Sequence, residues 1–123
     1  MPYVIVRESK GSYKKFSGYV THAEFLQSIF DNNNDPDFDR MRYAINDFLD
    51  VQDHSVNIDH VNTAVVHGLG ASFTNAKIKL AIVTIDPKIC TLVRLYSSHV
   101  KYPVKIFSTL SNARDWIGER PCD

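Results

Sequence analysis

The sequence of 123 residues contains few of the features that mark specialised classes of protein. Its two cysteines, Cys90 and Cys122, are too few for a disulfide framework or a cysteine-based metal site. No segment approaches the run of about 20 apolar residues that crosses a membrane, so we expect no membrane span. Residues 1–8 contain no basic leader, and their apolar run is too short for a signal peptide. These absences make a cytoplasmic protein the expectation.

An excess of charge is absent as well. Fourteen lysines and arginines balance fourteen aspartates and glutamates, so the formal net charge is zero. Proteins that bind nucleic acid usually carry a basic excess or a basic stripe, and the lysines here are scattered along the chain. We therefore expect no nucleic-acid partner. A net charge near zero opposes self-association only weakly, so a homodimer is compatible with the composition.

What the sequence does contain is an alternation of two apolar periods. Runs of period two, typical of strands, alternate with stripes of period 3.6, typical of helices. This alternation predicts an α/β fold of order ββαβαβαβα in a single domain over residues 1–123, with a mixed sheet of about five strands and four helices. Segments 43–48 and 80–84 are expected in the interior of the sheet. The expected strands are residues 3–7, 13–20, 41–49, 77–85 and 103–107.

Two short motifs predict where helices begin. Thr21 followed by Glu24 forms a capping box, in which each side chain bonds the backbone amide of the other residue. Asp86 followed by Pro87 predicts a second helix start, because proline at the first helical position loses no hydrogen bond. Ser108 is expected to begin the last helix.

Other segments predict where elements end. The polar stretch 50–57 is expected to connect the third strand to the second helix. Gly68 and Gly70 are expected to end that helix, because glycine readily adopts the left-handed conformation found after helix ends.

The polar motifs do not assemble a reaction centre. Asp53, His54 and Ser55 are consecutive, whereas catalytic triads are built from separate segments that meet in space. His60 and His67 are seven residues apart, whereas a helical zinc site uses histidines four residues apart with a third ligand. We therefore predict no metal site.

The aromatic residues are numerous for so small a core. Most are expected to pack in the interior. Some are expected to line an apolar cleft between a helix pair and the sheet, which would suit a small hydrophobic, lipid-like ligand. The alternative is an exposed patch used for dimerisation. The residues that we assign to the cleft are Phe25, Tyr43, Phe48, Tyr96 and Trp116.

Several short segments carry a resemblance to a known family. They are residues 18–21 (Gly-Tyr-Val-Thr), 43–47 (Tyr-Ala-Ile-Asn-Asp), 80–83 (Leu-Ala-Ile-Val), 104–107 (Val-Lys-Ile-Phe) and 113–117 (Ala-Arg-Asp-Trp-Ile). With these segments the chain resembles the sporulation stage II anti-sigma-factor-antagonist-like family, the wider group that includes STAS domains, over nearly its whole length. The resemblance implies a sheet backed by helices, no cofactor and no catalysis.

The resemblance also implies a candidate switch. In the antagonist branch, a serine at the start of the second helix is phosphorylated by a partner kinase, and its nearest counterpart here is Ser55. The further serine and the glycine of that motif are replaced by Val56 and Asn57. A phosphate beside helix amides would change docking, whereas an unmodified Ser55 would be only a cap or loop residue. The candidates for a phospho-switch or partner-docking site are Ser55, Asp53, His54 and Asp59.

From these observations we expect a non-enzymatic regulatory or protein-interaction module whose protein partner is unknown. The alternative is a carrier or sensor of a small hydrophobic ligand bound in the apolar cleft. An enzyme would instead require a cleft in which several titratable groups with perturbed pKa values converge.

Overall fold

The computed structural model describes residues 3–75 and 77–118, with the backbone alone for residues 68–74. The elements follow in the order ββαβαβαβα, as predicted. Their bounds are β1 (Tyr3–Glu8), β2 (Gly11–Val20), α1 (His22–Asn33), a 3-10 turn η1 (Phe38–Arg40), β3 (Tyr43–His54), α2 (Ile58–Thr74), β4 (Lys79–Val83), α3 (Pro87–Ser97), β5 (Val104–Phe107) and α4 (Leu110–Ile117).

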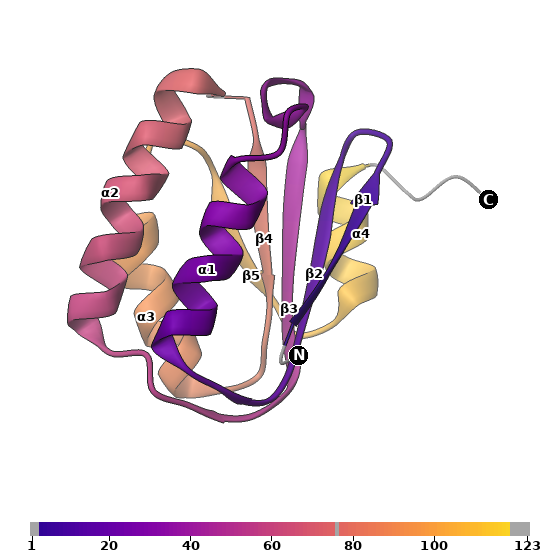
Figure 1. The fold of residues 1–123 in the computed structure, drawn as a ribbon. Coiled ribbons are helices and arrows are strands. Elements are labelled where there is room, and N and C mark those ends of the chain that lie inside the picture. The colour runs from indigo at the N-terminus through magenta and orange to yellow at the C-terminus, as the bar shows by residue number, and fades with distance from the viewer. Residues whose placement is uncertain (1–2, 76, 119–123) are drawn as a thin grey trace.

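The five strands form one mixed sheet in the order β1-β2-β3-β4-β5. Strands β1 and β2 form an antiparallel hairpin, whereas β2 to β5 are parallel. Both segments expected in the interior are there, since β3 and β4 have neighbours on both sides. Each parallel strand is added on the same side of the previous one, and parallel crossovers are right-handed. Helices α1, α2 and α3 therefore cover one face of the sheet, and α4 covers the other (Figure 1).

The side chains of β3 alternate between these two faces, as strand geometry requires. Tyr43 and Ile45 pack on the α4 face, in a buried cluster that includes Val83 and Ile117. Ala44 packs on the opposite face, in a second buried cluster with Met41. The sheet is thus apolar on both faces, which explains why its interior strands are so rich in apolar residues.

Both predicted helix starts are confirmed. The amide of Glu24 donates to Thr21 Oγ1 over 3.2 Å, and the amide of Thr21 donates to Glu24 Oε1 over 3.0 Å. At the start of α3, Asp86 Oδ1 accepts from the amide of Lys88 over 2.8 Å, with Pro87 in the first turn. The last helix begins at Leu110 rather than at Ser108, with Thr109 as its N-cap.

The predicted connection at residues 50–57 is wrong for residues 50–54. Strand β3 continues to His54 because its polar end pairs with the end of β2, for example Asp53 with Tyr19. Asp50 and Asp53 are exposed, so a polar sequence is compatible with a strand at the rim of the sheet.

The predicted stop at Gly68 and Gly70 is also wrong, because α2 runs through both to Thr74. A glycine inside a helix costs only about 1 kcal/mol relative to alanine. Packing of the apolar face of α2, with Val61 and Ala64 buried, outweighs that cost.

Candidate functional site

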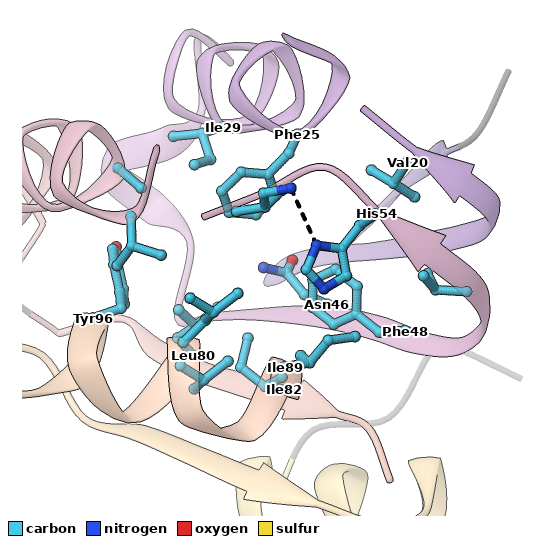
Figure 2. A pocket seen from close by; sticks show the side chains of 16 residues that line it. Val20, Phe25, Ile29, Asn46, Phe48, His54, Leu80, Ile82, Ile89 and Tyr96 are labelled. Atoms are coloured by element: carbon cyan, nitrogen blue, oxygen red, sulfur yellow. Dashed lines mark hydrogen bonds between the residues drawn. The ribbon is translucent and has the colours of Figure 1, made fainter. Parts of the chain in front are cut away.

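An apolar cavity, here called the main cavity, lies between the sheet and helices α1, α2 and α3. It has a volume of about 100 Å³. Figure 2 shows the side chains that line it. Apart from Asn46, His54 and Tyr96, its lining is apolar. The residues that line it are Val20, Phe25, Ile29, Asn46, Phe48, Val51, His54, Val56, Val61, Ala64, Leu80, Ile82, Ile89, Leu92, Val93 and Tyr96.

The small side chain of Ala64 contributes to this space. Ala64 is 1% exposed and belongs to the face of α2 that lines the cavity. Protein interiors normally leave few voids larger than a water molecule, because side chains interdigitate. Most of the surrounding positions carry large apolar side chains, so an unfilled cavity here is a feature that needs a physical explanation.

Asn46 brings an unpartnered polar atom to this apolar site. Its Oδ1 is fully buried and has no hydrogen-bond partner among the described residues. Figure 2 shows the Asn46 amide among the cavity side chains, beside His54. Because most buried polar atoms in native proteins are hydrogen-bonded, this amide is a candidate for contact with a ligand.

The other two polar residues of the main cavity are already engaged. His54 Nδ1 accepts from the amide of Val56 over 3.1 Å, which is the dashed bond in Figure 2. The Tyr96 hydroxyl shares a short hydrogen bond with the hydroxyl of Tyr102. Burial is the main cause of a raised pKa at Tyr96, and the neighbouring Tyr102 raises it further.

A second cavity, of about 60 Å³, adjoins the first. The two cavities share Ile29, Asn46, Leu80 and Tyr96 as lining residues. The second is the more polar one, because Lys14, Asn32 and Asn33 also line it.

Lys14 is the charged group of the second cavity. It is 3% exposed, and its Nζ donates to Ser28 O over 3.2 Å and to Ser28 Oγ over 3.4 Å. Burial lowers the pKa of Lys14 to about 7, although the charge of Asp31 acts in the opposite direction. Near neutral pH this amine is therefore divided between its charged and neutral forms.

The structure brings together three of the five residues assigned to the cleft. Phe25, Phe48 and Tyr96 line the main cavity. The assignment of Tyr43 and Trp116 is wrong, because both lie on the α4 face of the sheet. Tyr43 is out of phase with Asn46 and Phe48 along β3, so its side chain points to the other side.

Two residues of the site were missed by the sequence analysis. Lys14 alternates with Ser12 and Phe16 along β2, all three of which are buried, and this period places its side chain on the face that α1 covers. Asn46 occupies an inward position of β3 between apolar neighbours. A polar residue in phase with an apolar strand face is the signal that could have identified both.

Ser55 lies in the loop between β3 and α2, three residues before the first residue of α2. Its Oγ accepts from the amide of His22 at the start of α1 over 2.8 Å and lies 3.2 Å from His22 Nδ1. The amide of His60 in the first turn of α2 instead donates to Asn57 Oδ1. Ser55 is thus a loop residue bonded to the start of α1.

The other docking candidates, Asp53, His54 and Asp59, lie before and after this loop and do not form one cluster. Asp53 and Asp59 are exposed, the first at the end of β3 and the second in the first turn of α2. His54 turns inward to the main cavity. The rings of His22 and His60 stack with their centroids 4.2 Å apart, which joins the starts of α1 and α2.

No three histidine, cysteine or acidic side chains of residues 3–75 and 77–118 are arranged to hold a metal ion. No helix in that part of the chain is long and apolar enough to span a membrane.

No protein-family model matches the chain, and no curated protein does either. Solved structures do match it. The anti-sigma factor antagonist SpoIIAA in its unphosphorylated form aligns with a TM-score of 0.66 at 9% identity, covering 96% of this chain and 99% of that one. An anti-sigma factor antagonist from Mycobacterium paratuberculosis aligns with a TM-score of 0.51 at 8% identity, covering 95% and 93%.

A third match is an uncharacterised protein of the DUF3478 family from Shewanella loihica PV-4, which has a SpoIIAA-like fold. It is 18% identical, with a TM-score of 0.55, and the alignment covers 94% of this chain and 91% of that one. At these identities the matches describe the fold rather than the function. The sequence resemblance is confirmed at that level: the chain has the SpoIIAA-like α/β fold.

Proposed function

We propose that this protein is a non-enzymatic module that binds a small hydrophobic molecule in the main cavity. The observation that carries the proposal is an apolar cavity that contains one unpartnered polar atom, Asn46 Oδ1. Sites for small molecules typically combine an apolar lining with a few placed polar groups. Asn46 would orient the ligand, and the apolar walls would supply most of the binding free energy.

The volume of the main cavity limits the size of the ligand. A cavity of about 150 Å³ lined by aliphatic and aromatic side chains stays dry and binds benzene in another protein. The main cavity, at about 100 Å³, therefore favours a single ring or a short chain over a complete lipid.

The absence of catalysis is part of the proposal. Two titratable groups of the main cavity, Tyr96 and His54, support it, whereas Lys14, whose pKa burial lowers to about 7, lines the second cavity. General acid–base catalysis favours a group whose pKa is near the working pH. Tyr96 has a raised pKa, and its hydroxyl is hydrogen-bonded to the hydroxyl of Tyr102. His54 Nδ1 already accepts a hydrogen bond from the backbone amide of Val56.

The test is an NMR titration with toluene, which carries no polar group and probes the cavity alone. We expect saturable shifts confined to residues around the cavity, and Ala64→Phe should abolish them by filling it. Val66→Phe is the matched control, because Val66 is on the same helix but 67% exposed. Uniform or unsaturable shifts, or equal binding by Ala64→Phe, would contradict the proposal.

A second candidate function is the docking of a protein partner at the β1 edge of the sheet. Val4 and Val6 support it, because they are 58% and 48% exposed on a strand that has a free edge. Exposed apolar side chains on an edge strand favour pairing with another chain. Val4→Lys with Val6→Lys should abolish capture of such a partner, whereas Val66→Lys should not.

The loop around Ser55 is the competing place for a partner. If the partner docks at this loop, charge reversal at Asp53 and Asp59 should weaken capture of the partner, and the Val4→Lys, Val6→Lys variant should leave capture unchanged.

If Ser55 is a phosphorylation switch, Ser55→Asp should change the affinity for the partner, and unchanged affinity would exclude the switch. The position of Ser55 Oγ beside the first amide of α1 supports this test, because helix amides stabilise negative charge.

A further inference from the structure

The second cavity places a buried amine against the apolar site. Lys14 belongs to the row of β2 side chains that α1 covers. Its Nζ donates to two neutral oxygens of Ser28 and lies over the ring of Phe16, 5.8 Å from the ring centroid. No carboxylate of the described residues forms an ion pair with it. Asp31 acts on it only from a distance and is itself bonded to Tyr3 and Gln27.

An unpaired amine in the interior is costly to the fold. Lysine is seldom fully buried without a partner, because burial removes the hydration of its charge. Ser28 does not depend on the amine, since its hydroxyl already donates to Phe25 O over 2.7 Å. A methionine would fill the same space without the cost, so the amine at residue 14 points to an anion that it would pair with.

The two cavities lie next to each other and share part of their walls. Ile29, Leu80, Tyr96 and Asn46 line both, so an occupant of the main cavity lies next to the space that Lys14 faces. Rotation of the Asn46 amide would break no hydrogen bond of its oxygen, because Asn46 Oδ1 has no partner. The amide can therefore turn and present its N–H group to an acceptor in the second cavity.

From this arrangement, and resting on the proposed function, we propose that the ligand is a small carboxylic acid. Its apolar body would fill the main cavity, and its carboxylate would accept hydrogen bonds from Lys14 Nζ and the Asn46 amide in the second cavity. A carboxylate has two oxygens for these two donors, and it is compact enough for a space of about 60 Å³. Charge-assisted hydrogen bonds of this kind are roughly twice as strong as neutral ones.

The experiment compares acids with the corresponding alcohols. Butyrate, hexanoate and octanoate are titrated at pH 6.5 by calorimetry against butan-1-ol, hexan-1-ol and octan-1-ol, with acetate as the probe that has no apolar body. For the best chain length we expect the acid to bind about tenfold or more tightly than the alcohol. Acetate should bind weakly, because it cannot use the main cavity.

Lys14→Met should remove the preference for the acid and leave the affinity for the alcohol within about twofold. Lys15→Met is the matched control, because Lys15 is the next residue of β2 but is exposed and pairs with Asp50 over 2.9 Å. A second readout is the NMR titration of the Lys14 ε-methylene group. Its pKa should rise when hexanoate is bound, which a merely structural amine bonded to Ser28 would not show.

The outcomes separate the two proposals. Equal affinity for acid and alcohol, or a preference for the acid that survives Lys14→Met, overturns the carboxylate site and leaves the apolar site standing. Failure of every probe to bind overturns both. Acid binding that depends on Lys14 but is unaffected by Ala64→Phe overturns the placement of the apolar body in the main cavity.

Discussion

At the scale of single residues, Lys14 should make stability depend on pH in an unusual direction. Its pKa falls from about 10.5 in the unfolded chain to about 7 in the fold. Between these values the unfolded chain binds more protons than the folded protein, so stability rises with pH. Below pH 7 both states are protonated, and the full cost of the buried charge remains.

Lys14→Met removes this dependence. The variant should be the more stable protein at pH 6, and its advantage should shrink by about 1.4 kcal/mol per pH unit between pH 7 and pH 10. Urea unfolding of both proteins across this range measures the difference, with exposed Lys15→Met as the control. Parallel stability curves for the Lys14→Met variant and the unmodified protein would show that the lysine is not buried as described.

Asn46 and Asn75 offer a second matched comparison. Asn75 Nδ2 donates to Phe38 O over 2.8 Å and to Met41 O over 2.7 Å, whereas Asn46 Oδ1 has no partner. Asn46→Leu should therefore raise the free energy of unfolding by about 1 kcal/mol, and Asn75→Leu should lower it by about 2 kcal/mol or more. Thermal and urea unfolding measure both. A loss of stability in Asn46→Leu equal to that in Asn75→Leu would mean that Asn46 has a structural role.

At the scale of elements, an ion pair fastens α4 to the β1 edge of the sheet. Arg114 donates to both carboxylate oxygens of Glu8, over 2.6 and 2.7 Å, and the Tyr43 hydroxyl donates to the same carboxylate. The side chains of Arg114 and Glu8 are only 9% and 8% exposed. Removing one partner would leave a buried, uncompensated charge.

Arg114→Met should lower the free energy of unfolding by about 3–5 kcal/mol, because the Glu8 carboxylate stays behind without its partner. The double variant Glu8→Leu with Arg114→Met should recover much of that loss. A double-mutant cycle measured by urea unfolding gives the coupling between the two side chains. Additive losses would contradict the account, because they would mean that the pair is not coupled.

The elements themselves were largely predictable from the sequence. Their order and the starts at Thr21 and Asp86 follow from local periodicity and capping chemistry, which act within one turn of chain. The errors at Gly68, Gly70 and residues 50–54 share a cause. In each, contacts with a distant segment override a local signal: the packing of α2 against its neighbours and the pairing of β3 with β2.

At the scale of the whole molecule, the site depends on which face each residue takes. Phe25, Phe48 and Tyr96 meet in the main cavity, but Tyr43 and Trp116 do not, since α4 crosses to the other face of the sheet (Figure 1). Composition cannot distinguish these aromatic residues. The alternation along β3 places Tyr43 and Phe48 on opposite faces of the sheet. It shows which of them lines the cavity only once the helices that cover each face are known.

The same dependence explains why the cavity itself could not be predicted. It arises where three helices and the sheet fail to fill a common space, which is a property of their joint packing rather than of any one segment. Lys14 and Asn46 can be recognised as candidate ligand contacts only once the cavities that they line have been located. Ligand binding by this protein therefore depends on the main cavity.

Crystals of the protein under xenon pressure would test this most directly, because xenon enters dry apolar cavities and is located by its anomalous scattering. We predict a xenon site enclosed by Phe25, Leu80 and Val61, and the loss of this site in Ala64→Phe. Side chains that close the space, with no xenon between the sheet and helices α1 to α3, would contradict it.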